Sequence, residues 1–177
     1  MKIMVALANG FEEIEAFTVI NVLRRAGIAV DTVGIVGSVI ESMHNTRIMV
    51  DKRLVEVDVD QYDGIVLPGG TPGYVNLGRS SSLLEMLKRF DSQGKIIAAI
   101  CMSSSILAKA GLLEGRRATI YPGEEHGLPY PRAERVMVDS NIITSQAPGT
   151  AMEFSLVLVE RLAGSRMAEK LRKDLLV

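Results

Sequence analysis

The sequence predicts an α/β fold in which a mostly parallel β-sheet is covered by helices on both faces. The order of the segments predicts this fold, and the length and uniformity of the chain indicate the number of domains. Short apolar runs typical of buried strands alternate with segments whose apolar residues recur at helical spacing. The 177 residues also contain no internal repeat, linker or low-complexity segment, and a chain of this length can build one substantial core. We therefore expect a single domain over residues 1–177.

The first elements are the most clearly marked. Residues 2–7 form an apolar run that ends at an Asn-Gly turn, which predicts a buried strand. The next segment predicts a helix, because four apolar residues, identified at the end of this paragraph, lie in a stripe on one side of it. This helix should end at Gly27. Residues 28–35 predict the second strand. Residues 36–60 alternate apolar and polar positions, which indicates short strands or a hairpin. The stripe consists of Ala16, Val19, Ile20 and Leu23.

Strands and helices continue to alternate in the rest of the chain. The sequences SLLE at 82–85 and TAME at 150–153 have the capping-box pattern that begins a helix. We expect strands at 64–67, 95–100, 118–121, 135–138 and 142–145. We expect helices at 82–90, 103–110 and 150–162, and a short charged helix at the end of the chain.

The predicted sheet brings three distant segments together. The carboxyl ends of parallel strands gather along one edge, and ligands of such folds bind outside that edge. Each of three strands is followed there by residues able to do chemistry. The segments are ANGFEEIE (8–15), LPGGTPG (67–73) and ICMSS (100–104).

Cys101 is the only cysteine, and it stands where the strand at 95–100 meets the helix at 103–110. A residue at such a junction presents its side chain at the edge of the sheet, as serine does in the nucleophile elbow of hydrolases. The positive end of a helix favours a thiolate and lowers the pKa of a thiol. The alternative is an inert cysteine packed in the core, since free cysteine is among the most buried residue types.

Glycines and carboxylates accompany this thiol. The N–H groups of Gly69 and Gly70 can stabilise an oxyanion, although two glycines after a strand also form ordinary turns. Glu12, Glu13 and Glu15 open the first helix, where carboxylates stabilise a helix N-terminus. In the functional interpretation, one of these carboxyls faces the thiolate, which raises the pKa of the carboxyl and lets it relay protons.

The chain has only two histidines. His126 lies in a loop rich in proline and glycine and is a candidate base for Cys101, although an exposed loop histidine is equally consistent with the sequence. His44 lies among the short strands, where we expect solvent or a dimer partner around it. One cysteine and two distant histidines provide no metal-ligand spacing, so we expect no metal site.

Several classes of function are not supported. No G-x-G-x-x-G follows the first strand, so a dinucleotide site is not expected, and the carboxylates after Gly10 would repel the phosphate of a flavin. The formal net charge of −1 gives no indication of nucleic acid or an anionic membrane. No apolar run is long enough to span a bilayer. With one cysteine and no secretion signal, we expect a cytoplasmic protein.

Five motifs, in the same order along the chain, resemble those of the DJ-1/PfpI (ThiJ/PfpI) superfamily, and the resemblance covers nearly the whole sequence. It is closer to the DJ-1-like branch than to the PfpI proteases, which usually carry histidine after the cysteine, where this chain has Met102. The motifs are GFEEIE (10–15), RRAG (24–27), LPGG (67–70), AAIC (98–101) and TSQAPGTAMEF (144–154).

The resemblance implies a three-layer, flavodoxin-like sandwich with a nucleophile elbow, usually assembled as a homodimer. It implies that Cys101 is an oxidisable nucleophile and that Glu15 hydrogen-bonds to its sulfur and handles protons. Arg47 resembles an arginine that reaches a neighbouring subunit's pocket. His126 falls in the loop where DJ-1-like members place a pocket histidine, about two residues out of register. The N–H groups implied to line an oxyanion pocket are those of Gly69, Gly70 and Met102.

Four functions stay open at this stage. The resemblance implies a cofactor-free enzyme of the glyoxalase III/deglycase type, a lyase or hydrolase that acts on small reactive aldehydes and converts methylglyoxal to lactate. In that reaction Cys101 forms a hemithioacetal and Glu15 relays protons. The main alternative is an oxidative-stress sensor or chaperone whose Cys101 is oxidised to sulfinate. A cysteine peptidase is less favoured, because Met102 replaces the peptidase histidine. The fourth is a pseudo-enzyme with a merely packed cysteine.

Overall fold

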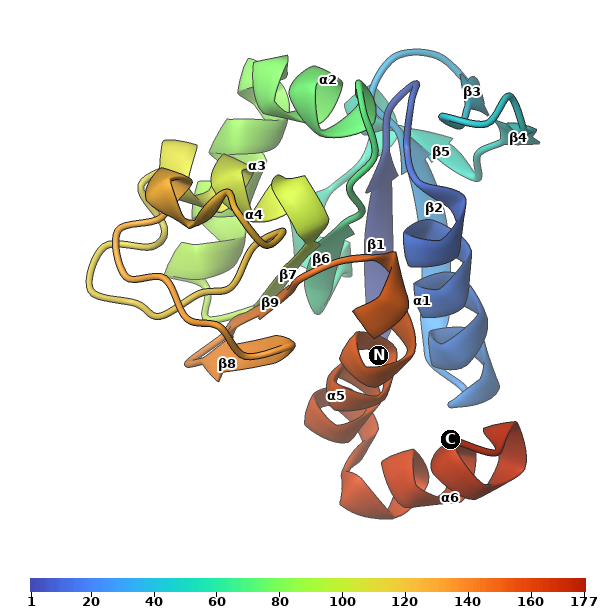
Figure 1. The fold of residues 1–177 in the computed structure, drawn as a ribbon. Helices are drawn as coiled ribbons and strands as arrows, with labels where there is room; N and C mark the ends of the chain where they lie inside the picture. Colours follow the sequence, from blue (N-terminus) through green and yellow to red (C-terminus); the bar gives the residue numbers. More distant parts are fainter.

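The computed structural model describes all of residues 1–177 and confirms the predicted sheet between layers of helices (Figure 1). The strands of the main sheet lie in the order β5-β2-β1-β6-β7-β9-β8. Every neighbouring pair is parallel except β8 and β9, which are antiparallel. These strands are β1 (Lys2–Leu7), β2 (Ala29–Gly34), β5 (Lys52–Arg53), β6 (Gly64–Leu67), β7 (Ile96–Ile100), β8 (Val136–Asp139) and β9 (Ile142–Ser145).

Helices cover both faces of the sheet (Figure 1). Strand β1 shows why both faces are buried, because its alternate residues belong to two separate hydrophobic clusters. Ile3 and Val5 pack in the cluster under one set of helices, whereas Met4 and Ala6 pack in the cluster under the other. The first set is α1 (Glu13–Arg25), α5 (Ala151–Ala163) and α6 (Ser165–Leu175), and the second is α2 (Gly73–Arg79), α3 (Ser81–Ser92) and α4 (Ser104–Lys109).

The region of short strands contains the expected hairpin. Strands β3 (Val39–Glu41) and β4 (Arg47–Met49) pair antiparallel as a small separate sheet. The hairpin packs against the start of α1, where the Glu13 carboxylate accepts hydrogen bonds from the Ser42 hydroxyl and the His44 backbone N–H. This contact brings the hairpin to the carboxyl edge of the main sheet.

One expected strand is absent, and one helix was missed. Residues 118–121 do not form a strand: apart from one bridge between Ala118 and Pro131, they lie in the long connection before β8. The Thr119 backbone N–H donates a hydrogen bond to the side-chain hydroxyl of Thr144. In a strand, this N–H would donate to a backbone carbonyl of the neighbouring strand. Conversely, helix α2 was not expected, because its seven residues are too few to display an apolar stripe.

Neither expected capping box forms as predicted. Helix α3 begins one residue before SLLE, and the hydroxyl of Ser80 accepts its capping bond from the Leu83 N–H. Helix α5 does begin after Thr150, but the Thr150 hydroxyl accepts from the Ala147 N–H of the preceding turn. None of the helices combines the length and apolar character needed to cross a membrane.

Candidate active site

A pocket of about 400 Å³ opens beside Cys101 at the carboxyl edge of the sheet. Residues of all three segments that were expected to converge line it, so the expected convergence is confirmed. They come from the loop and helix after β1, the loop after β6 and the turn after β7. These lining residues are Glu12, Glu15, Gly70, Thr71, Cys101 and Met102.

Cys101 occupies a strained elbow. Strand β7 ends at Ile100, and a 3-10 turn, η3 (Cys101–Ser103), leads into α4. The φ angle of Cys101 is 61°, in the left-handed region that residues other than glycine rarely adopt. The Ser103 hydroxyl donates a 2.6 Å hydrogen bond to the Pro68 carbonyl and thereby ties the elbow to the loop after β6. The thiol is therefore presented to the pocket by a fixed backbone.

Glu15 lies in the first turn of α1 and is fully buried. Its N–H donates a 2.7 Å hydrogen bond to the Glu12 carboxylate, which caps the helix. Its own Oε2 accepts a 2.7 Å hydrogen bond from the Gly69 N–H, whereas Oε1 has no partner in the chain. A buried carboxyl oxygen without a partner is costly, so its presence in a folded chain calls for an explanation.

Close backbone packing holds this carboxyl beside the thiol. A Cβ atom on Gly69 would lie 2.8 Å from both the Cys101 Cβ and the Glu15 Oε2, so the two side chains flank the same residue. Gly70 has a φ angle of 92°, and a Cβ there would lie 2.4 Å from the backbone N of Glu12. Only glycine fits at either position without moving the loop.

Burial governs the ionisation of both groups. It raises the pKa of Glu15 to about 7, an effect that the Gly69 hydrogen bond opposes and the charge of Glu12 reinforces. Burial also raises the pKa of Cys101 to about 12, and the Glu15 carboxylate adds to this rise. The N–H groups of Met102 and Gly70 act in the opposite direction.

The pKa of Glu15 thus moves in the expected direction, but the expected fall in the pKa of Cys101 does not occur. Helix α4 begins only at Ser104, after the 3-10 turn, so burial and the adjacent carboxylate outweigh its positive end. A thiolate and a carboxylate side by side would repel, so a thiolate forms here most readily when its proton moves to Glu15. This transfer leaves the charge of the pair unchanged, and Glu15 is therefore placed to act as a base for Cys101.

Other predicted residues lie elsewhere. His126 is 79% exposed at its side chain, lies 3.9 Å from the Glu124 carboxylate and does not line the pocket, so the structure does not bring it to Cys101. The N–H of Gly69 is used by Glu15 instead of facing the pocket. Arg47 pairs with Glu41 across the hairpin, on the surface.

Sequence reasoning missed part of the pocket wall. Met43, Tyr74, Tyr121 and Glu124 contribute side chains from segments that carry no motif of their own. The only available signal was the position of Tyr121 and Glu124 in the loop that contains His126. Tyr121 and Glu124 reach the Cys101 pocket only because the long connection before β8 returns to the carboxyl edge of the sheet.

Three ligand-type side chains also cluster beside the pocket. Ligand atoms of Glu12, Glu13 and His44 lie within 4.8 Å of one another. These groups already have partners, because Glu13 bonds to Ser42 and His44 and Glu12 caps α1. The cluster is explained by the packing of the hairpin on α1.

Comparisons with known proteins agree with this geometry. A family model described as DJ-1/PfpI family matches residues 1–161. Protein dj-1beta of Drosophila melanogaster is 40% identical over 98% of this chain and 96% of its own length. The Parkinson disease protein 7 homolog of Danio rerio is 36% identical over 99% and 97% of the two chains. The solved structure described as Toxoplasma gondii DJ-1, oxidized, has a TM-score of 0.96 at 37% identity, covering 99% and 97% of the two chains.

The buried carboxyl predicts a pH-dependent stability. The pKa of Glu15 is about 7 in the folded chain against a reference value of 4.5, so between these values the folded chain retains a proton that the unfolded chain loses. The free energy of unfolding should therefore fall as the pH rises, by about 3 kcal/mol from this group. Urea denaturation across this range should show that Glu15→Gln removes most of the fall.

Glu85→Gln is the matched control, since Glu85 is exposed on α3 and pairs only with Lys88. It should keep the pH dependence of the unmodified chain. A Glu15→Gln profile that runs parallel to that of the unmodified chain would contradict the assignment.

Proposed function

Because the chain belongs to the DJ-1/PfpI family, we propose that it is a cysteine-dependent, cofactor-free enzyme of the glyoxalase III/deglycase type that acts on small reactive aldehydes. The observation that supports this most is the pairing of the Cys101 thiol with a buried carboxyl whose pKa is near neutrality. A base is most effective when its pKa lies close to the working pH. The pocket of about 400 Å³ suits a small substrate.

In the proposed first step, Glu15 takes the thiol proton while the sulfur attacks the aldehyde carbon of methylglyoxal. The new bond joins sulfur to carbon, and the negative charge passes to the aldehyde oxygen. The N–H groups of Gly70 and Met102, both of which lower the pKa of the Cys101 thiol, are the proposed donors to this charge. Glu15 then returns the proton to this oxygen, which gives a hemithioacetal and leaves Glu15 as a carboxylate for the next step.

In the second step, a proton moves from the former aldehyde carbon to the neighbouring ketone carbon. Glu15 is the proposed carrier, since its Oε1 is buried and has no partner in the chain. The hydroxyl proton of the hemithioacetal passes to the ketone oxygen, so the hemithioacetal carbon becomes the carbonyl of a thioester and the ketone becomes an alcohol. Water then cleaves the thioester to lactate and returns the thiol, so the overall reaction consumes only water.

The same geometry favours one alternative, a redox sensor. The fixed elbow and the two N–H groups at the sulfur could hold an oxidised Cys101 as a sulfinate, with protonated Glu15 as a hydrogen-bond donor. The related T. gondii structure is described as oxidized. A sensor thiol must stay reduced until an oxidant reaches it, and the reducing cytoplasm, the compartment we propose for this chain, would keep it so. The peptidase alternative has no support, because no histidine lines the pocket.

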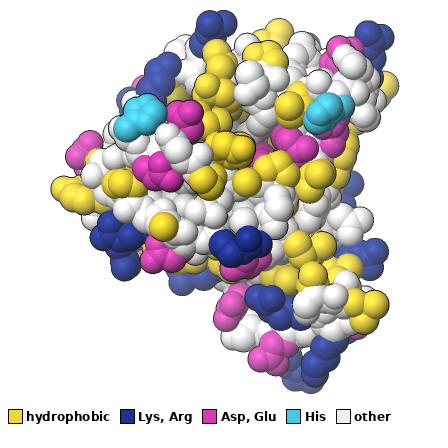
Figure 2. Space-filling model, viewed as in Figure 1, with side chains coloured by type: hydrophobic (Ala, Val, Ile, Leu, Met, Phe, Trp, Pro, Cys, Tyr) yellow, Lys and Arg dark blue, Asp and Glu magenta, His cyan; other side chains and the backbone are white.

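We also propose that the chain forms a homodimer through α1 and the β3–β4 hairpin. Apolar side chains remain exposed on this face, Ile14 at 56%, Phe17 at 37% and Met49 at 81%. Figure 2 shows hydrophobic side chains with acidic side chains beside them over this part of the molecule. Met43 belongs both to the hairpin and to the pocket wall, so a second subunit on this face would border the pocket.

Turnover should depend on the thiol and the buried carboxyl. We expect Cys101→Ser to abolish lactate formation from methylglyoxal, and Glu15→Gln to lower kcat by about 10²- to 10⁴-fold because the base is lost. His126→Gln is the control and should keep full activity, since this side chain lies on the surface. Equal turnover by the unmodified chain and Cys101→Ser would refute the mechanism.

The pocket should discriminate against anionic aldehydes. Three carboxyls line it, those of Glu12, Glu15 and Glu124, and no lysine, arginine or histidine does. We expect kcat/KM for 4,5-dioxopentanoate, an anionic 2-oxoaldehyde able to follow the same steps, to be at least about tenfold below that for methylglyoxal at low salt. Glu124→Gln removes one of the repelling charges, so it should bring the kcat/KM values of the anionic and neutral aldehydes closer together. A ratio that Glu124→Gln leaves unchanged would exclude Glu124 as a source of selectivity.

Mild peroxide treatment separates the enzyme from the sensor. If the chain is an enzyme, fresh protein should form lactate at a steady rate, and mass spectrometry should find Cys101 unmodified after that turnover. Stoichiometric sulfinate at Cys101, together with no lactate from fresh protein, would favour the sensor.

Light scattering coupled to size-exclusion chromatography tests the dimer. Phe17→Asp should shift the protein to the monomer mass, because a charge would be buried in the interface. Val55→Asp is the control: Val55 is 84% exposed but lies in a turn outside the proposed face. A monomer mass for the unmodified chain at micromolar concentration would contradict the proposal.

A further inference from the structure

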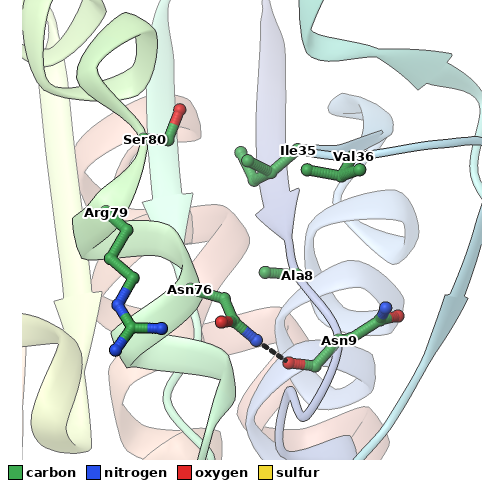
Figure 3. A pocket seen from close by; sticks show the side chains of 7 residues that line it. All are labelled: Ala8, Asn9, Ile35, Val36, Asn76, Arg79 and Ser80. Carbon is green, nitrogen blue, oxygen red and sulfur yellow. Dashed lines mark hydrogen bonds between the residues drawn. The ribbon is translucent and has the colours of Figure 1, made fainter.

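A second pocket, of about 440 Å³, lies at the carboxyl edge of the sheet (Figure 3). Ala8 and Asn9 follow β1, Ile35 follows β2, and the end of α2 closes the opposite side. None of the residues that line it lines the Cys101 pocket. Ligands of parallel α/β sheets bind outside the carboxyl ends of strands, so the location suits a binding site.

The two sides of this pocket differ in character. Ala8, Ile35 and Val36 form an apolar side, and Figure 3 shows the side chains of Ile35 and Val36 across the pocket from those of α2. Val36 is 78% exposed, so its methyl groups are available to a ligand. The side chains on the α2 side are all polar. A ligand that fills the pocket therefore needs both an apolar and a polar part.

The polar side offers hydrogen-bond donors and one positive charge. The guanidinium of Arg79 forms no ion pair, whereas Arg89 and Arg116, which lie in and beside the same helical layer, are both paired. The Ser80 hydroxyl accepts from the Leu83 N–H and keeps its own proton to donate. No carboxylate lines the pocket. These features select an anion.

The geometry of the polar side is partly fixed in advance. The Asn76 amide donates a 2.8 Å hydrogen bond to the Asn9 carbonyl, drawn as a dashed line in Figure 3, and so holds α2 against the loop after β1. Helix α2 ends and helix α3 begins at Ser80, so the opposite partial charges of the two helix ends meet there. The full charge at the site is therefore that of Arg79 alone.

From these observations, we propose that this pocket binds a small organic monocarboxylate with a short apolar chain. The carboxylate accepts two parallel N–H bonds from the planar guanidinium of Arg79, and the apolar chain packs against Ile35 and Val36. A volume of about 440 Å³ is in the range of small-molecule sites. The proposal does not depend on the chemistry of Cys101.

Protein-observed NMR on the full chain tests the proposal with two matched probes. The probes are 3-methylbutanoate and its neutral amide, titrated at low salt. We expect saturable shifts at the backbone amides of Ala8, Val36 and Arg79 with the acid, and at least about tenfold weaker binding of the amide.

Two variants complete the test. Arg79→Gln should weaken binding of the acid at least about tenfold, and Arg166→Gln, which removes an exposed arginine of α6, should bind like the unmodified chain. Thermal unfolding checks that both variants are folded. If Arg79→Gln does not fold, the comparison of acid and amide on the unmodified chain decides.

Several outcomes would overturn the proposal. They are equal binding of the acid and the amide, full binding by folded Arg79→Gln, and shifts confined to Cys101 and its neighbours. Tighter binding of inorganic phosphate than of the acid would show that the site is built for a different anion. The absence of saturable binding of the acid up to about 100 mM would exclude a site of useful affinity.

Discussion

The close approach of two loops is the constraint on which the site depends. The loop after β1 and the loop after β6 pack backbone against backbone, and hydrogen bonds from Glu12 N to Gly69 O and from Gly73 N to Gly10 O join them at 3.1 Å each. A Cβ atom at Gly10 would lie 2.4 Å from the ring of Pro72. Because no side chain separates the loops, the start of α1 lies directly over the elbow at the end of β7. A carboxyl on α1 can then reach the thiol.

The amphipathic register of α1 links this constraint to the core. Glu15 lies one helical turn before Val19, so it projects from the face that packs on the sheet. The apolar stripe that stabilises the helix therefore also forces a carboxyl into the interior. Burial is what raises its pKa towards neutrality. The stability of the helix and the acid–base property of the site have one physical origin, the orientation of a single helix.

Much of this arrangement could be predicted from the sequence. Apolar periodicity located β1 and α1, and the rule that carboxyl ends of parallel strands converge brought together the segments that contain Glu15, Gly70 and Cys101. The family resemblance then singled out Glu15 from the three carboxyls of its segment. Features that depend on three-dimensional surroundings could not be predicted. Helix α2 is too short to show a period, and a side chain took the place of a strand partner for residues 118–121. The direction of the pKa shift of Cys101 depended on burial and a neighbour distant in sequence.

The left-handed backbone of Cys101 has a consequence for how this sequence can change over time. A φ angle of 61° at a residue with a Cβ costs about 1–2 kcal/mol, whereas glycine adopts it freely. Selection for stability alone would therefore favour glycine at position 101. Cysteine occupies this position despite the cost, so folding stability alone does not explain the residue found there, and drift after a loss of function should remove the thiol early.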